Sequence, residues 1–177
     1  MTREAWVKKY GPLAISVTSG TGVFPEVLLS QAIVESSRDG IPGESLLSKQ
    51  YHNYHGLKVW PKFKGKSVNL KTREVYSGKD KYINSNFAIF DTIQDGFKGY
   101  VQFLKDNPRY ADNGVFKAKN ATEQIQALKR AGYATDPQYV TIVNSVAMKI
   151  KGWLSNITPE KGIAGVWGLL LIGTLFF

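Results

Sequence analysis

The chain has 177 residues, of which 43% are hydrophobic and 21% charged, and its formal net charge is +9. This composition is that of a folded protein, and the length suits one globular domain with a short appendage. The sequence contains no cysteine, which excludes a disulfide framework and a thiolate metal site.

The N-terminal part of the chain is predicted to be helical. A first helix is expected over about Arg3–Ser19, and this stretch lacks the apolar core of an export signal. A second helix begins with Pro25 in its first turn, after the breaker sequence GTGVFP. A shorter helix over about Glu44–Gln50 leads to the segment YHNYHGLK.

A small antiparallel sheet is predicted next, in a β-lobe over about residues 56–90, because KSVNL and REVYSGKDKYINSNFAIF alternate and turn. The lobe is basic, because residues 58–81 contain eight lysines and arginines but only two acidic residues, Glu74 and Asp80. Such a cluster attracts nucleic acid, anionic lipid or an acidic cell-wall polymer, although lysines also protect sheet edges. Charge alone leaves these alternatives open.

Three further helices are expected in DTIQDGFKGYVQFLKDN, ATEQIQALKRAG and PQYVTIVNSVAMKIKGWL, separated by the loops NPRYADNG and YATD. The fold class is therefore α+β, a helical body with one inserted β-lobe. We expect a folded domain over residues 1–155, a linker over 156–162 and an apolar tail helix over 163–177. The tail IAGVWGLLLIGTLFF could be a marginal membrane span, an interfacial anchor or a hydrophobic docking peptide.

Glu35 is the one ionisable residue in the stretch LLSQAIVESS of the second helix. This helix is apolar around nearly its whole circumference, through Val27, Leu28, Leu29, Ala32, Ile33 and Val34, and is therefore expected to be buried. Burial and the negative end of the helix dipole both favour the protonated carboxyl group, which is what a general acid requires. The alternative is a surface glutamate paired with Arg38.

Five segments carry a family resemblance: SQAIVESS, NYHGLK, KSVNLKTREVYSG, FAIFDTIQDGFKGYVQFLKDNPRY and AGYATDPQYV. In this order, from about Ala5 to Met148, they resemble glycoside hydrolase family 73, the peptidoglycan-cleaving N-acetylglucosaminidases of autolysins and flagellar-rod hydrolases. The resemblance implies a lysozyme-like fold and hydrolysis of the β-1,4 bond after N-acetylglucosamine, without a cofactor. Peptidoglycan glycan strands would be the partner, and no specific nucleic acid is expected.

The resemblance also implies roles for individual residues. The implied catalytic residues are Glu35 as general acid, Glu74 as second acidic residue and Tyr133 beside the acid. Substrate contacts are expected from Tyr139, Tyr110 and Asn53; packing is the alternative for the two tyrosines, and Asn53 also matches a segment whose role looks architectural. Trp60 on the lobe side is expected to supply a sugar-stacking face in place of an aromatic residue that the family has after its glutamate. His52 and His55 are too few ligands for a metal site, so no metal is expected.

One feature departs from the family pattern, and another leaves open where the protein acts. The exit SSRDG at residues 36–40 stands where the family has Ser-Gly-Trp-Gly, which leaves a catalytically weak, membrane-tethered glycan-binding or structural protein as the alternative. The substrate lies outside the cell although no export signal is visible. A phage virion that holds the tail in an internal membrane or hydrophobic socket would resolve this, as would a chain that is a fragment of a longer protein.

Overall fold

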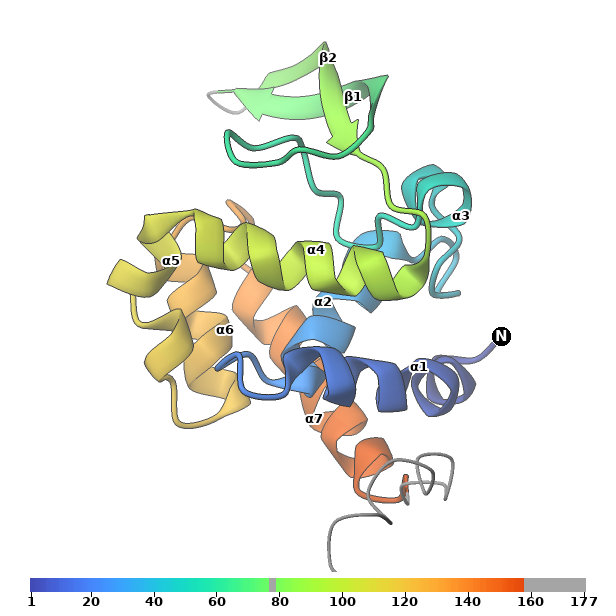
Figure 1. The fold of residues 1–177 in the computed structure, drawn as a ribbon, viewed down its shortest axis with the longest axis vertical. Coiled ribbons are helices and arrows are strands. Elements are labelled where there is room, and N and C mark those ends of the chain that lie inside the picture. Colours follow the sequence, from blue (N-terminus) through green and yellow to red (C-terminus); the bar gives the residue numbers. More distant parts are fainter. Residues whose placement is uncertain (77–78, 158–177) are drawn as a thin grey trace, which may run out of the picture.

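The computed structural model describes residues 1–76 and 79–157, and within the sheet the side chains of residues 73–80 are not described. The predicted tail helix over residues 163–177 and nearly all of the predicted linker lie outside the described residues. Figure 1 shows the helices gathered in one body, with the two strands on one side of it.

The elements in chain order are α1 (Arg3–Thr18), α2 (Pro25–Ser36), α3 (Leu46–Tyr51), β1 (Ser67–Tyr76), β2 (Lys79–Ala88), α4 (Ile93–Asp106), α5 (Pro108–Asp112), the 3₁₀ helix η1 (Val115–Lys117), α6 (Ala121–Arg130) and α7 (Tyr139–Leu154). The predicted α+β class with an inserted lobe is confirmed. The prediction of a loop over NPRYADNG is wrong in part, because α5 lies there. Pro108 opens α5 in its first turn, and the α5 residue Tyr110 is fully buried.

Side-chain caps explain several helix starts. The hydroxyl of Thr2 accepts a hydrogen bond from the Ala5 amide at the start of α1, and Ser45 caps α3 in the same way. Thr92 and Asn120 accept from the amides of the third helical residues of α4 and α6. Each cap satisfies an amide that the helix itself leaves without a partner.

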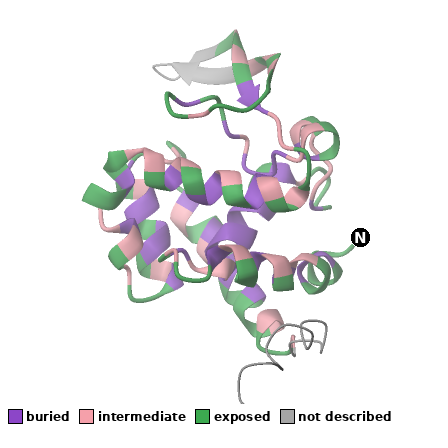
Figure 2. Cartoon of the chain, in the orientation of Figure 1, coloured by how far each residue is buried: buried purple, intermediate pink, exposed green. Residues whose placement is uncertain are grey.

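Helix α2 lies at the centre of the body and packs against α7, α1 and α6. Of the six apolar residues that predict a buried helix, five have no exposed area and Val34 is half-buried, so the body of the helix is buried as predicted. Figure 2 shows the same concentration of buried residues at the centre of the helical body. This packing fixes the direction of α2 and therefore the place of the side chains in its last turn.

The lobe consists of the antiparallel pair β1 and β2, with register from Ser67 opposite Ala88 to Tyr76 opposite Lys79. Backbone hydrogen bonds join it to the preceding segment, from Ala88 to Leu57 and from Val59 to Asn86. The segment from residue 52 to residue 66 therefore connects the lobe to the helical body. No helix in the described residues is long and apolar enough to cross a membrane.

Candidate active site

Glu35 lies in the last turn of α2 and is exposed to solvent on one side, so the prediction that its side chain is buried with the helix is wrong. Protein atoms on the remaining sides exclude part of its hydration, and this desolvation raises the pKa of the carboxyl group above its ordinary value. Solvent contact limits the size of that shift. Within the described part of the chain, Glu35 has no ion-pair partner, so the alternative of a pair with Arg38 finds no support.

Hydrogen bonds fix the SSRDG segment, residues 36–40, which follows Glu35. The fully buried Ser36 donates its hydroxyl to the carbonyl of Ala32 at 2.5 Å and accepts the Gly43 amide at 2.9 Å. The chain then reverses between Arg38 and Ile41, through Asp39 and Gly40, whose φ angles of 52° and 79° suit a type I′ turn. The exit is thus a tight turn anchored to α2, and its Asp-Gly dipeptide is the sequence signal for it.

Three tyrosines, Tyr100, Tyr133 and Tyr139, lie close enough to Glu35 for its charge to act on them. Burial raises the pKa values of Tyr100, Tyr133 and Tyr139, and the negative charge of Glu35 is a further cause in each case. The ring centroid of Tyr133 lies 6.3 Å from that of Tyr100 and 6.1 Å from that of Tyr139. The structure therefore brings Tyr133 and Tyr139, from the α6–α7 connection and from α7, to the end of α2.

The hydroxyl of Tyr133 is buried and has no hydrogen-bond partner in the part of the chain that the structure describes. A buried hydroxyl without a partner is costly, and such groups often serve a bound ligand or water. Tyr110 lies behind Tyr133, with ring centroids 6.3 Å apart, and its hydroxyl accepts a hydrogen bond from Arg109 at 2.8 Å. The zero exposure of Tyr110 gives it a packing position, whereas Tyr133 offers a free polar atom beside Glu35.

Gln31, one helical turn before Glu35, is a site residue that the sequence reasoning missed. Its side chain is fully buried, donates from Nε2 to the hydroxyl oxygen of Tyr139 and accepts from the hydroxyl of Tyr100. The amide thereby fixes both rings beside Glu35. The hydrogen of the Tyr139 hydroxyl is not used in these bonds and stays available to a ligand. A polar residue within an otherwise apolar helix was the signal that could have found it.

We expect Gln31→Met to lower turnover several-fold, because Tyr139 and Tyr100 lose the amide that orients them. Gln124 provides a matched control, since it is equally buried but bonds to Phe24, Gly22 and Val115 on the far side of the body. Gln31→Met and the control Gln124→Met should each lower the free energy of unfolding by roughly 1–3 kcal/mol, because each leaves buried polar partners unsatisfied. Only Gln31→Met should also shift the pH profile of kcat/KM; equal kinetic effects would remove Gln31 from the site.

The two histidines do not form a metal site. His55 is buried, its Nε2 bonds to the carbonyl of Leu28 at 3.0 Å, and its ring stacks on Tyr100 with centroids 4.1 Å apart. Burial lowers the pKa of His55 to about 3, so the ring is neutral at physiological pH. Among the described residues, no group of three potential ligands could hold a metal ion.

Asn53 has an architectural position. Its side chain is 1% exposed, accepts from the Leu57 amide at 2.8 Å and donates to the carbonyls of Leu57 and Ala88, both at 2.9 Å. All three bonds hold the connection between body and lobe. These bonds support the architectural role of Asn53, and its contact with substrate stays a prediction.

We expect Asn53→Ala to destabilise the fold by about 2–4 kcal/mol, because two carbonyls and an amide lose their buried partner. The effect should appear in thermal or denaturant unfolding. The Michaelis constant of the folded fraction should change little. A strong rise in that constant without loss of stability would instead support a substrate contact.

Trp60 lies apart from the tyrosines. It is 6% exposed, donates from Nε1 to Asp106 at 2.8 Å, and packs on Phe63 and Phe103. Phe103 in turn contacts Tyr110, so two aromatic rings stand between Trp60 and Tyr133. The structure does not bring Trp60 next to Glu35.

Glu74 lies in β1, where its backbone is opposite Lys81. Its side chain lies outside the described part of the structure, so its role as second acidic residue stays a prediction.

Comparison with known proteins identifies the family of this chain. Residues 11–152 match the family model described as mannosyl-glycoprotein endo-beta-N-acetylglucosaminidase, named Glucosaminidase. This chain belongs to the glucosaminidase family. The resemblance to glycoside hydrolase family 73 is thereby confirmed.

Members of the glucosaminidase family similar to this chain include peptidoglycan hydrolase FlgJ of Pseudomonas aeruginosa, 33% identical over 144 residues. A probable N-acetylmuramidase of Lactococcus lactis is 31% identical over 150 residues. These matches cover 79% and 81% of this chain but only 35% and 32% of the relatives, so the chain spans about a third of their length. A crystal structure of a peptidoglycan hydrolase mutant from Sphingomonas sp. A1 aligns with TM-score 0.67 and 26% identity, covering 87% of this chain and 99% of that one.

Proposed function

We propose that this chain is a peptidoglycan hydrolase that cleaves the β-1,4 bond after N-acetylglucosamine, with Glu35 as general acid. One observation carries the proposal: a carboxyl group with a raised pKa stands at the end of a buried helix, near a tyrosine hydroxyl, that of Tyr133, and neither group has a polar partner among the described residues. A carboxyl group at the end of a central helix, with a β-lobe inserted after it, is also the lysozyme-like arrangement expected from the sequence. The names of the relatives support the same substrate class.

The chemistry starts from the protonated form of Glu35, which its raised pKa favours. Its proton passes to the glycosidic oxygen as the bond to the anomeric carbon breaks, and positive charge develops on the sugar ring. The hydroxyls of Tyr133 and Tyr139 can donate to the substrate on the side of the buried tyrosine cluster. Gln31 acts as a positioning residue behind them.

Three routes can complete the reaction, and in each of them a water molecule finally takes the place of the leaving sugar. Glu74 would activate a water if its carboxyl group stands roughly 6.5–9.5 Å from that of Glu35, or act as nucleophile at roughly 5 Å. Alternatively, the acetamido group of the substrate would act as nucleophile. Glu74→Gln should cost less turnover than Glu35→Gln under the acetamido route and about as much if the carboxylates act as one unit.

The experiment that tests the proposal is digestion of purified peptidoglycan, followed by mass spectrometry of the reduced muropeptides. We expect new reducing ends on N-acetylglucosamine. Reducing ends on N-acetylmuramic acid would assign the other bond, which the name of the Lactococcus relative indicates for that protein. Binding without any release of fragments would favour the alternative of a glycan-binding protein with the altered SSRDG exit.

Attachment through the apolar residues 163–177 to a membrane or a hydrophobic socket, including that of a phage virion, is a further part of the proposal. It is motivated by their composition alone. The full chain should float with vesicles, a chain ending at Ile157 should not, and both should digest isolated walls at similar rates. A full chain that stays monomeric without detergent would refute the attachment.

A further inference from the structure

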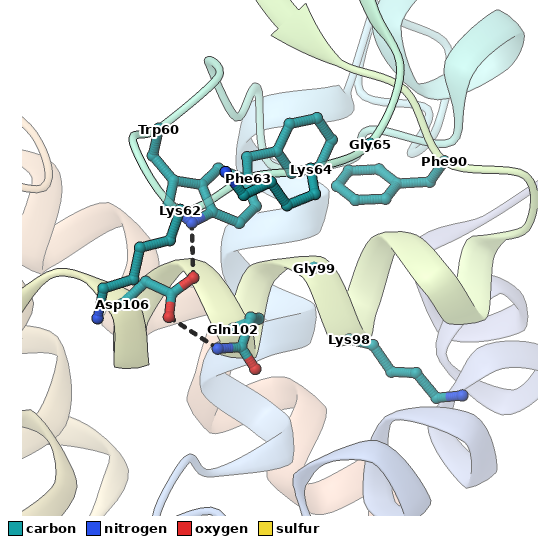
Figure 3. Close-up of a pocket in the computed structure, with 10 residues that line it drawn as sticks. All are labelled: Trp60, Lys62, Phe63, Lys64, Gly65, Phe90, Lys98, Gly99, Gln102 and Asp106. Carbon is teal, nitrogen blue, oxygen red and sulfur yellow. Dashed lines mark hydrogen bonds between the residues drawn. The ribbon is translucent and has the colours of Figure 1, made fainter.

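A second site lies between the segment 58–66 and α4, in an open pocket of about 350 Å³. Figure 3 shows three aromatic residues on its upper wall, Trp60, Phe63 and Phe90, above the helix. Three lysines, Lys62, Lys64 and Lys98, also line it. The volume is at the lower end of the range for small-ligand pockets.

The apolar wall is built by close contact between rings and glycine backbone. A Cβ atom on Gly99 would stand 2.3 Å from the ring of Phe90, and one on Gly65 would stand 2.6 Å from the ring of Phe63. Only glycine permits these approaches. Both phenylalanine rings stay half-exposed, so they present apolar area to a ligand.

The rim of the pocket is positively charged. Lys62, Lys64 and Lys98 are all exposed, and none forms an ion pair with another described residue. The one carboxylate in the lining, Asp106, accepts hydrogen bonds from Trp60 and Gln102, both at 2.8 Å. The bond from Trp60 is the largest cause that lowers the pKa of Asp106, and the bond from Gln102 and the nearby charge of Lys62 lower it further. Asp106 thus bonds within the wall and balances part of the charge of Lys62, while the three lysines leave the rim with a net positive charge for an anion.

The pocket is separate from the site at Glu35. The rings of Phe103 and Tyr110 stand one after the other in space between the rings of Trp60 and Tyr133, and each ring contacts the next. Glu35 and its three tyrosines contribute no lining residue. A ligand in the pocket would therefore not occupy the position of the bond that is cut.

We propose that this pocket binds the peptide stem of peptidoglycan, a short chain of carboxylates and small apolar side chains. The methyl groups would lie on Phe63 and Phe90, and the carboxylates would face the lysines. A hydrophilic phosphate polymer would also meet the lysines but would gain nothing from the aromatic wall. The substrate class rests on the function proposed above, whereas the pocket chemistry does not.

The test compares binding of two probes to the full chain carrying Glu35→Gln, which prevents turnover. One probe is a disaccharide tetrapeptide, and the other is the same disaccharide without peptide. Replacing Lys62, Lys64 and Lys98 together by Gln should weaken binding of the peptide-bearing probe about tenfold at low salt, because exposed ion pairs contribute a few-fold each. Binding of the peptide-free probe should not change. The indole N–H signal of Trp60 should shift with the first probe only.

A control triple substitution removes the same charge elsewhere, at the exposed lysines Lys117, Lys119 and Lys149. Equal weakening by the control would reduce the effect to overall charge and overturn the proposal. A glycerol phosphate oligomer that binds as tightly as the tetrapeptide probe, with the same sensitivity to Lys62, Lys64 and Lys98, would overturn the assignment to the stem. Because binding is measured without turnover, failure of hydrolysis and failure of this site are distinguishable.

Discussion

Glu35→Gln is expected to lower turnover on peptidoglycan by about a hundredfold or more, which is the usual contribution of a general acid. Glutamine keeps the shape of the side chain but has no proton of suitable acidity to give to the leaving oxygen. The fold should persist, since Glu35 has no ion-pair partner to lose within the described residues. Released reducing ends and unfolding free energy should be measured on the same preparation.

The sign of the stability change gives a second check. The pKa of Glu35 is raised in the folded state, so its stabilising contribution is present below the ordinary pKa and is lost as pH rises through the folded value. At neutral pH the variant should therefore be at least as stable as the wild type. Glu26→Gln in the first turn of the same helix is a matched control, because Glu26 is also a glutamate of α2 but lies at its opposite end. Comparable kinetic losses in both variants would contradict the role of Glu35.

The stability of the protein is expected to fall steeply between about pH 6 and pH 4, by roughly 2–3 kcal/mol through His55 alone. Burial lowers the pKa of His55 from 6.5 to about 3, so the unfolded chain binds a proton over this range that the folded protein does not. Stability from this group is fully present above the ordinary pKa and is lost as pH falls toward the folded value. Denaturant unfolding at several pH values measures the slope.

His55→Phe isolates the effect, since phenylalanine can keep the stack on Tyr100 but cannot take up a proton. The variant loses the hydrogen bond to Leu28 and should be less stable at neutral pH, yet its stability should depend less on pH. Other titrating groups are common to both proteins and cancel in the difference. If the free energy of unfolding depended on pH in the same way in wild type and variant, His55 would take up its proton as readily in the folded protein as in the unfolded chain.

The sequence predicted the helices that bury one apolar stripe and the lobe whose residues alternate. It predicted α2 because an uninterrupted apolar helix has only the core to occupy. It missed α5 because this helix has only five residues, begins with proline and lies between two asparagines, a composition typical of a loop. The helix depends instead on the burial of Tyr110.

Candidate site residues could be predicted where a single residue stands out in its local sequence. They could not be predicted where the role of a residue depends on hydrogen bonds to distant segments. Glu35 is conspicuous in an apolar helix, and Tyr133 was found through the family motif. The bonds of Gln31 to Tyr100 and Tyr139 join residues 69 and 108 positions apart, which spacing cannot reveal. Trp60 was placed with the substrate by its residue type, whereas its indole bonds to Asp106 across 46 positions.

The most direct measurement is the titration of the Glu35 carboxyl group by carbon NMR, compared with the pH dependence of kcat/KM on a soluble glycan substrate. We predict that Glu35 titrates above its ordinary pKa and that kcat/KM declines, as pH rises, through the same value. The Glu35→Gln variant should lack this decline. A carboxyl group that titrates at its ordinary value, or a rate independent of its ionisation, would contradict the assignment of Glu35 as general acid.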